Sequence, residues 1–173
     1  MEHSENQFNC LDGIHVLVAD NSEAEREMLV HVLGLYGARV SATGSARSAL
    51  HAIRATKPDV LVSDISLDDC DGYCLVRELR ALPAAAGGET PAVAVTGWAT
   101  ESDRAAALEA GFHVHLVKPV ALEALVTIVA TLARTRGTNA SDVTDSARAR
   151  DVESGRLGAS GSTSPGAVAD QQS

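Results

Sequence analysis

Four carboxylates lie close together in the stretch VLVSDISLDDCDGY, which covers residues 60–73. Asp64 ends the apolar run, and Asp68, Asp69 and Asp71 follow it within seven residues. Two like charges about 4 Å apart repel by roughly 4 kcal/mol at an effective dielectric constant near 20, so such a cluster needs water, protons or a cation. The stretch is therefore either a solvated loop or part of a cation site.

The other apolar runs of the chain also end on polar side chains: Asp20, followed by Asn21, then Thr96 and Lys118. Each residue alone has an ordinary structural use, as a turn, a helix cap, a strand hydroxyl or a surface charge. Together with Asp64 they make a chemical set, because carboxylates bind Mg²⁺, a lysine balances phosphoryl oxygens and a hydroxyl hydrogen-bonds one of them. One carboxylate then remains as a nucleophile that can form an aspartyl phosphate.

Five short, Val-rich apolar runs predict the strands that must position these groups. They cover residues 14–20, 38–43, 60–64, 92–96 and 114–118. Runs of this kind are typical of parallel strands covered on both faces, and the more polar second run fits an edge strand.

Helical periodicity fills the segments between these runs. Ser22 and Glu25 predict a capping box at the start of the first helix, which Gly37 ends. Ala105, Leu108 and Phe112 are predicted to line one face of a fourth helical segment around Gly111. Five strand–helix units with short connections predict an α/β fold, a doubly wound five-stranded parallel sheet with helices on both faces. Such a sheet binds ligands at the carboxyl ends of its strands, where the polar residues stand.

Charge and composition argue against several classes of partner. The net charge is -9, so we expect no basic surface for nucleic acid or an anionic membrane. The best apolar run, residues 125–133, is shorter than the roughly 20 residues that a membrane-spanning helix needs. The N-terminus lacks the features of a signal peptide, and Cys10, Cys70 and Cys74 show no paired metal-ligand spacing. We therefore expect a cytoplasmic protein with reduced thiols.

Composition divides the chain into three parts. Residues 1–11 form a short N-terminal extension, residues 12–136 hold the predicted strands and helices, and residues 137–173 are rich in Gly, Ser, Thr and Ala. The last part has too few large apolar side chains to repay its ordering entropy, so we expect a disordered tail.

Four segments resemble the receiver domain of bacterial two-component response regulators. They are VLVADN (16–21), SDISLDDCDG (63–72), VTGWA (95–99) and AGFHVHLVKP (110–119), which occur in the order and at the spacing of that family. The resemblance covers about residues 11–135, and the last segment is similar to receivers fused to hybrid histidine kinases. It implies a flavodoxin-like sheet with strand order 2-1-3-4-5 and Mg²⁺ as cofactor.

The resemblance also implies a role for each matching residue. Asp64 is the expected phosphoacceptor, and Asp20 belongs to the acidic group around Mg²⁺, which the backbone carbonyl of Ser66 also faces. Thr96 is the expected switch hydroxyl. Lys118 is expected to pair with the phosphoryl group, and the peptide bond to the proline after it is expected to be cis. The other carboxylates of the opening stretch are assigned to a solvated loop and a helix start.

Two positions depart from the family pattern. Asn21 stands where a second acid usually binds the metal directly, and its amide oxygen can bind Mg²⁺ but brings no charge. We therefore expect weaker Mg²⁺ binding and slower phosphorylation than in a site with two acids. His115 stands where many members have Tyr or Phe, the switch side chain that turns inward on activation, and its charge near pH 6.5 could couple signalling to pH.

These features together favour a single-domain, phosphorylation-dependent switch, with no enzyme activity beyond its own phosphorylation and dephosphorylation. A histidine kinase or a histidine phosphotransfer protein is the expected phosphoryl donor. A downstream protein, which the sequence does not identify, is expected on the surface of the fourth helix, fifth strand and fifth helix, where two copies could also pair weakly.

Two other functions compete with this interpretation. Asn21 would suit a receiver-like interaction module that acts without phosphorylation, although the retention of Asp64, Thr96 and Lys118 argues against it. A phosphohydrolase of the haloacid-dehalogenase type also uses a strand-end Asp, but it typically has a second Asp where Ser66 stands, so the general acid is missing.

Overall fold

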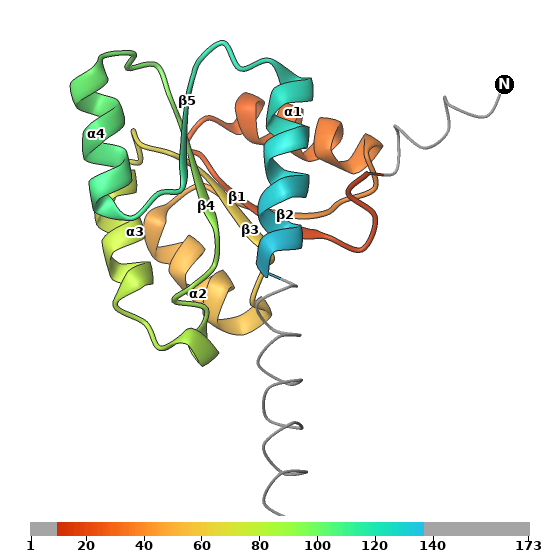
Figure 1. Ribbon diagram of the computed structural model, residues 1–173, viewed down its shortest axis with the longest axis horizontal. Helices are drawn as coiled ribbons and strands as arrows, with labels where there is room; N and C mark the ends of the chain where they lie inside the picture. Colours follow the sequence, from red (N-terminus) through yellow and green to blue (C-terminus); the bar gives the residue numbers. More distant parts are fainter. Residues whose placement is uncertain (1–9, 137–173) are drawn as a thin grey trace, which may run out of the picture. The chain divides into compact units, whose positions relative to one another are not determined.

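Five short strands lie parallel in one sheet of the computed structural model, which describes residues 10–136 (Figure 1). They are β1 (His15–Ala19), β2 (Arg39–Thr43), β3 (Val60–Asp64), β4 (Ala92–Thr96) and β5 (Val114–Val117). Their order is β2-β1-β3-β4-β5, which confirms the predicted doubly wound, flavodoxin-like fold and the edge position of β2. The predicted tail and most of the predicted N-terminal extension lie outside the described residues.

Helices cover both faces of this sheet (Figure 1). One face carries α2 (Ala46–Thr56), α3 (Gly72–Arg80) and α4 (Glu101–Ala110), with the 3-10 turn η1 (Ala84–Ala86) after α3. The other face carries α1 (Glu23–Leu35) and the helix over residues 122–136. Within residues 10–136, no helix combines the length and apolarity that crossing a bilayer requires.

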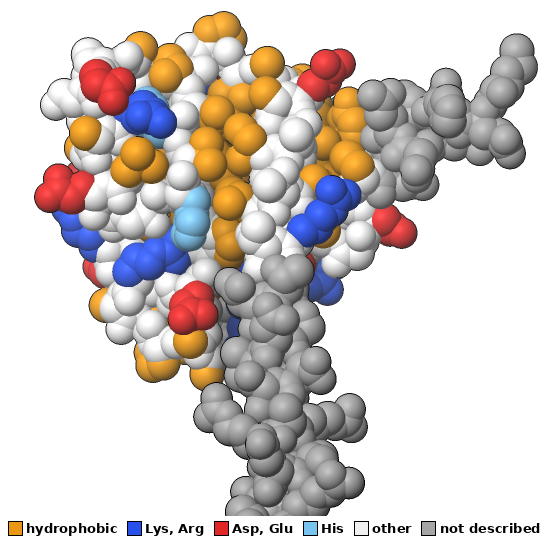
Figure 2. Space-filling model, viewed as in Figure 1, with side chains coloured by type: hydrophobic (Ala, Val, Ile, Leu, Met, Phe, Trp, Pro, Cys, Tyr) orange, Lys and Arg blue, Asp and Glu red, His pale blue; other side chains and the backbone are white. Residues whose placement is uncertain are grey.

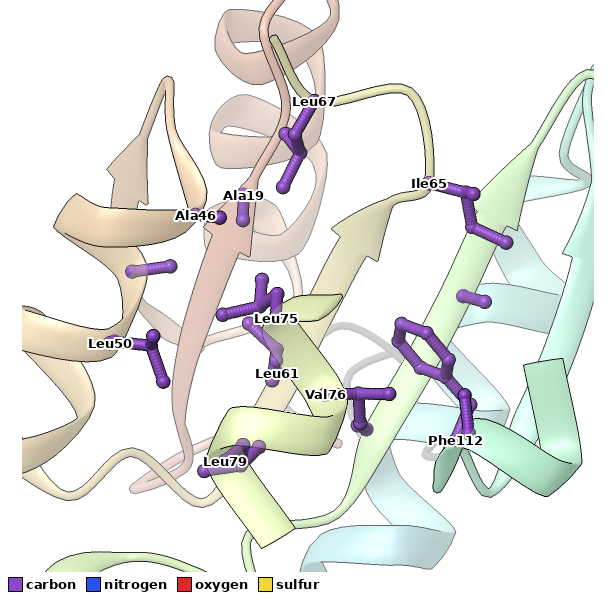
Figure 3. Close-up of a cluster of buried hydrophobic side chains, with 14 of the residues drawn as sticks. Ala19, Ala46, Leu50, Leu61, Ile65, Leu67, Leu75, Val76, Leu79 and Phe112 are labelled. Atoms are coloured by element: carbon purple, nitrogen blue, oxygen red, sulfur yellow. The ribbon is translucent and has the colours of Figure 1, made fainter. Parts of the chain in front are cut away.

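Two hydrophobic clusters hold the layers together, one on each face of the sheet. Figure 3 shows the first cluster, in which Leu61 of β3 lies among side chains of α3 that include Leu75 and Leu79. The second cluster contains Leu29 and Leu33 of α1, together with side chains from the opposite face of the same strands. Every residue of β1, β3 and β4 is buried, as expected of strands covered on both faces.

The buried face of α4 differs from the predicted one. Of the predicted residues, Phe112 is buried in the first cluster, whereas Ala105 is exposed and Leu108 is 39% exposed. Ala107 and Ala110 are buried there instead. Successive residues of a helix are turned by about 100°, so a helix that buries Ala107 and Ala110 leaves Leu108 at the surface. The prediction gave weight to the large apolar side chain of Leu108, but the small side chains of Ala107 and Ala110 pack against the first cluster.

The register of the sheet brings the carboxyl ends of its strands together. Asp64, the last residue of β3, pairs with Val95 of β4, and Thr96, the last residue of β4, pairs with Val117 of β5. The residues that follow β1 and β5 therefore reach the same edge as the end of β3.

Candidate functional site

Four of the predicted site residues stand at the carboxyl edge of the sheet. Lys118 Nζ lies 3.3 Å from Asp64 Oδ2 and 3.5 Å from Asp20 Oδ2, although 54 and 98 positions of the chain separate these pairs. The two carboxylates are almost fully buried, and Thr96 is fully buried at the end of β4. The peptide bond from Lys118 to Pro119 is cis, as expected.

Asp20 is fixed by the turn that leads from β1 into α1. Its Oδ1 accepts a hydrogen bond from the backbone N–H of Ser22 at 2.8 Å. Burial raises the pKa of Asp20 to about 6, while the Ser22 N–H and the charge of Lys118 act in the opposite direction. Near neutral pH the carboxylate is therefore a poorly hydrated anion, and a neighbouring cation stabilises it.

Asp64 is fixed by the loop that follows β3. Its Oδ1 accepts a hydrogen bond from the backbone N–H of Ser66 at 3.1 Å, while the Ser66 side chain is exposed. Gly72, at the start of α3, lies so close to this strand end that an added Cβ would stand 2.7 Å from the carbonyl oxygen of Asp64. A residue with a side chain would push the loop away from the carboxylate, so Gly72 sets this approach.

Thr96 directs its hydroxyl into its own loop. Oγ1 accepts a hydrogen bond from the backbone N–H of Trp98 at 3.2 Å. Beside it, a Cβ added to Gly97 would meet no atom within 4 Å, so the space on that side is open. A role as a switch requires the Thr96 hydroxyl to exchange its present partner for a group bound at Asp64.

Glu25 joins this cluster, which the sequence did not indicate. Lys118 Nζ donates a hydrogen bond to Glu25 Oε2, and this bond lowers the pKa of Glu25. Burial lowers the pKa of Lys118, but Glu25, Asp20 and Asp64 outweigh it, and the net shift is upward. One carboxylate oxygen from each of these three acids lies within 4.8 Å of the others. The ammonium group is thus shared by three carboxylates.

The predicted capping box of α1 is therefore half wrong. Ser22 does cap the helix, since its Oγ accepts a hydrogen bond from the backbone N–H of Glu25 at 3.4 Å. The Glu25 carboxylate binds Lys118, however, and the Ser22 N–H donates to Asp20. The available signal was the place of Glu25 in the first helical turn after β1, which puts it at the carboxyl edge of the sheet.

Asn21 is exposed, and its side chain is hydrogen-bonded to the loop that follows β3. Its Nδ2 donates to Asp68 Oδ1 at 2.9 Å. Asp69 accepts hydrogen bonds from the backbone N–H groups of Arg47 and Ala46, at 3.0 and 2.8 Å, and these bonds lower the pKa of Asp69. The loop carboxylates predicted to be merely solvated thus tie the loop to β1 and α2.

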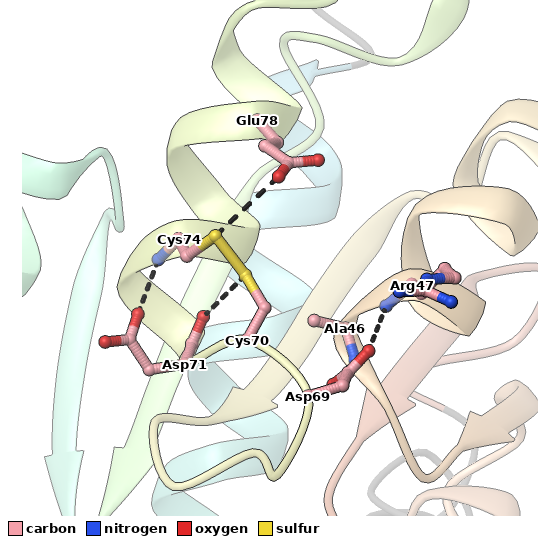
Figure 4. The surroundings of a disulfide bond; sticks show 7 residues. All are labelled: Ala46, Arg47, Asp69, Cys70, Asp71, Cys74 and Glu78. Atoms are coloured by element: carbon pink, nitrogen blue, oxygen red, sulfur yellow. Dashed lines mark hydrogen bonds between the residues drawn. A yellow bond between two sulfur atoms is a disulfide. The ribbon is translucent and has the colours of Figure 1, made fainter.

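The structure contradicts the prediction of reduced thiols in this loop. Cys70 and Cys74 form a disulfide bond with an S–S distance of 2.10 Å (Figure 4). The predicted helix start at Asp71 is confirmed, because Asp71 Oδ1 accepts a hydrogen bond from the Cys74 N–H at 2.7 Å and caps α3. This first turn of α3 brings Cys74 back to Cys70, a contact that the odd cysteine count did not suggest. Cys10 is a free thiol.

His115 and His113 occupy different environments at β5. The Nε2 atom of His115 is buried, and no hydrogen-bond partner for it occurs among residues 10–136. His113 Nδ1 accepts a hydrogen bond from the backbone N–H of Ala92 at 3.2 Å. Burial and the nearby charge of Arg80 lower the pKa of His113. Neither histidine belongs to the carboxylate cluster around Lys118.

Residues 16–130 match the family model of the response regulator receiver domain. The chain belongs to this family. It is 40% identical over 111 residues to an uncharacterized 14.6 kDa protein of Leptolyngbya boryana, a match that covers 64% of this chain and 82% of the relative. It is 34% identical over 122 residues to the response regulator MprA of Mycobacterium tuberculosis, covering 70% of this chain. The match spans about half of MprA, 51% of its length.

Solved structures of receiver domains share this fold. A putative response regulator from Chloroflexus aurantiacus is 30% identical, with a TM-score of 0.66, and the match covers 70% of this chain and 98% of that chain. The signal receiver domain of a histidine kinase from Syntrophus aciditrophicus is 26% identical, with a TM-score of 0.65, and the match covers 71% of this chain and 92% of that chain. The family resemblance and the predicted fold are therefore confirmed.

Proposed function

We propose that this receiver accepts a phosphoryl group on Asp64 from a histidine kinase or a histidine phosphotransfer protein, and then signals through altered protein binding. The observation that carries the proposal is the convergence of Asp20, Asp64 and Lys118 at the carboxyl edge of the sheet. A carboxylate oxygen of each acid lies within 3.5 Å of Lys118 Nζ. Family membership supports the phosphoryl donor, because receiver domains take part in two-component signalling.

The chemistry assigns a separate task to each group. A carboxylate oxygen of Asp64 attacks the phosphorus of phosphohistidine, the P–N bond breaks, and the departing imidazole nitrogen takes a proton from water. Lys118 Nζ, 3.3 Å from Asp64, balances negative charge on the phosphoryl oxygens. The Thr96 hydroxyl is assigned the switch step, in which it gives up the backbone N–H of Trp98 and turns toward the new group. The product is an aspartyl phosphate, which water later hydrolyses.

The donor set of the site fits a magnesium ion. Asp20 and Asp64 offer hard carboxylate oxygens, and the amide oxygen of Asn21 and the backbone carbonyl of Ser66 are donors of the same kind. When bound, Mg²⁺ neutralises charge on the carboxylates and the incoming phosphoryl group. Asn21 brings no charge and bonds Asp68, so it is the weakest of these ligands.

The output surface that we propose lies over α4, β5 and the helix over residues 122–136. Figure 2 shows hydrophobic side chains gathered between α4 and that helix. Leu108 of α4 and Val117 of β5 are each 39% exposed, so this surface offers apolar area to a downstream protein or a second copy. Thr96 is the proposed link from the site to this surface, because it ends β4 beside Val117 of β5, and His115 lies on the same strand.

Incubation with acetyl phosphate and Mg²⁺, followed by intact mass measurement, tests the proposal. We expect the protein to gain one phosphoryl group, and we expect no gain for Asp64→Asn or in the presence of EDTA. A wild-type protein that stays unmodified while its circular dichroism shows a folded domain would contradict the proposal. It would favour the second function, an interaction module that works without phosphorylation.

That second function rests on one observation. Asn21 lacks the charge of an acidic ligand, and its amide is bound to the loop carboxylate Asp68. If the protein is a module of this kind, wild type and Asp64→Asn would bind the downstream partner with equal affinity. The phosphorylation switch predicts a difference between the two after treatment with acetyl phosphate.

A further inference from the structure

The carboxyl edge holds more negative charge than its lysine can balance. Lys118 is the cation shared by Asp20, Asp64 and Glu25. Three ionised carboxylates and one ammonium group leave two negative charges, and two of the three acids are almost fully buried. A divalent cation would balance this surplus.

Glu25 is suitably placed to contribute to binding such a cation. Its carboxylate, like those of Asp20 and Asp64, has an oxygen within 4.8 Å of the other two. Two oxygens bound to one Mg²⁺ at about 2.1 Å lie at most about 4.2 Å apart, so a small movement brings the three oxygens within that range. Glu25 is 39% exposed, so its side chain has space for this movement.

The neighbouring acids are not placed in this way. Glu23 lies in the same first turn of α1 but is exposed, and its carboxylate is outside the cluster. Asp68 is exposed and accepts the amide hydrogen bond of Asn21. Among the described residues, Glu25 is therefore the acid that can replace the charge missing at position 21.

We propose that Glu25 supplies the second negative charge that Asn21 does not, as a third carboxylate ligand of Mg²⁺ beside Asp20 and Asp64. Lys118 holds the Glu25 carboxylate at the site before the metal binds. This inference rests on the proposed function, because it concerns the metal of the same site. It also changes the expectation for Asn21: the site has its full set of acids, but one of them comes from α1.

Direct Mg²⁺ titration of the full, unphosphorylated chain by calorimetry tests this proposal. Removal of one ligand charge in Glu25→Gln is expected to raise the dissociation constant for Mg²⁺ about tenfold. Glu23→Gln, which changes net charge equally, is the matched control and is expected to stay within about twofold. The single tryptophan, Trp98, donates a hydrogen bond from its backbone N–H to Thr96 Oγ1, and its indole provides a second, fluorescence readout.

Two further variants separate charge from shape. Glu25→Asp keeps the charge, and its Mg²⁺ affinity is expected to lie closer to wild type than to Glu25→Gln. Addition of Asn21→Asp to Glu25→Gln returns a carboxylate to position 21, and we expect it to restore the affinity lost in the single variant. In wild type, where Glu25 already supplies that charge, Asn21→Asp is expected to raise the affinity by a smaller factor than in Glu25→Gln, whereas a merely structural role of Glu25 predicts equal factors.

Equal Mg²⁺ affinity of wild type and Glu25→Gln, with both proteins folded by circular dichroism, would overturn the inference and leave the proposed function intact. Failure of Asn21→Asp to restore affinity would overturn it as well. If wild type itself bound no Mg²⁺, both the inference and the magnesium part of the proposed function would be wrong. These outcomes are therefore distinguishable in one set of titrations.

Discussion

Arg80 and Lys118 are both partly buried cations, but they are held by opposite kinds of partner. The Arg80 guanidinium donates to the backbone carbonyls of Gly88, Thr90 and Gly111, at 2.8 to 3.0 Å. Lys118 instead binds three carboxylates at the carboxyl edge. Neutral carbonyls bring no charge, so Arg80 keeps its single positive charge there, whereas the three carboxylates exceed the charge of Lys118 and leave a negative surplus. The role of Arg80 is therefore structural, whereas the surplus negative charge around Lys118 suits the binding of a further cation.

Arg80→Ala should give the largest loss of stability. Its removal leaves three backbone carbonyls without their donor, so we expect the free energy of unfolding to fall by about 3 kcal/mol. Urea denaturation measures this loss. Arg77→Ala, an exposed residue on the same helix, is the control and is expected to change the free energy by less than about 0.5 kcal/mol. If both variants lost equally little stability, the structural role of Arg80 would be refuted.

Lys118→Gln should give a smaller loss that depends on metal. Without the ammonium group, three carboxylates lack their counter-ion, and we expect the free energy of unfolding to fall by about 2 kcal/mol in EDTA. Mg²⁺ should recover more stability in this variant than in wild type, because it replaces the missing cation. Parallel urea titrations with and without Mg²⁺ measure the difference. The exposed Arg54→Gln, which loses the same charge, should show no such recovery.

The smallest effect concerns the histidine beside Arg80. Burial and then Arg80 hold the pKa of His113 below its ordinary value, so the unfolded chain takes up the proton first as pH falls. The contribution of His113 to stability is therefore fully present above about pH 6.5 and is lost as pH falls toward its folded pKa. Between pH 7.5 and 5.5, wild type should lose more stability than His113→Gln.

The exposed His51 provides the control for this pH experiment. His51→Gln removes an exposed histidine, and its stability is expected to follow that of wild type over the same pH range. Other titrating groups, such as Asp20, are common to all three proteins, so the comparison isolates His113. Identical curves for wild type and His113→Gln would contradict the assigned environment of His113.

The sequence predicted the strands well because their signal is local. The Val-rich runs at residues 60–64 and 92–96 coincide with β3 and β4, and the other strands begin and end within one residue of the expected limits. The buried face of α4 was harder to predict. In α4 the contact made by Ala107 and Ala110 carries a weaker hydrophobic signal than the exposed Leu108.

The errors at the site come from side chains with two available partners. Glu25 fits a capping box by its spacing to Ser22, yet Lys118 takes its carboxylate. Asp69 fits a solvated loop, yet the start of α2 offers it two backbone N–H groups, from Ala46 and Arg47. A sequence pattern predicts a partner that is close along the chain. In the folded protein an ionised side chain binds the partner that gives the stronger hydrogen bond, wherever that partner lies in the sequence.

The sequence by itself determined that Asp20, Asp64, Thr96 and Lys118 follow or end apolar runs, and hence that they reach one edge of a parallel sheet. Only the tertiary structure decided that Glu25 joins them. The physical reason is range. Strand and helix periodicity is set by neighbours a few residues away, whereas the Lys118 hydrogen bond to α1 spans 93 positions and exists only once the sheet has assembled.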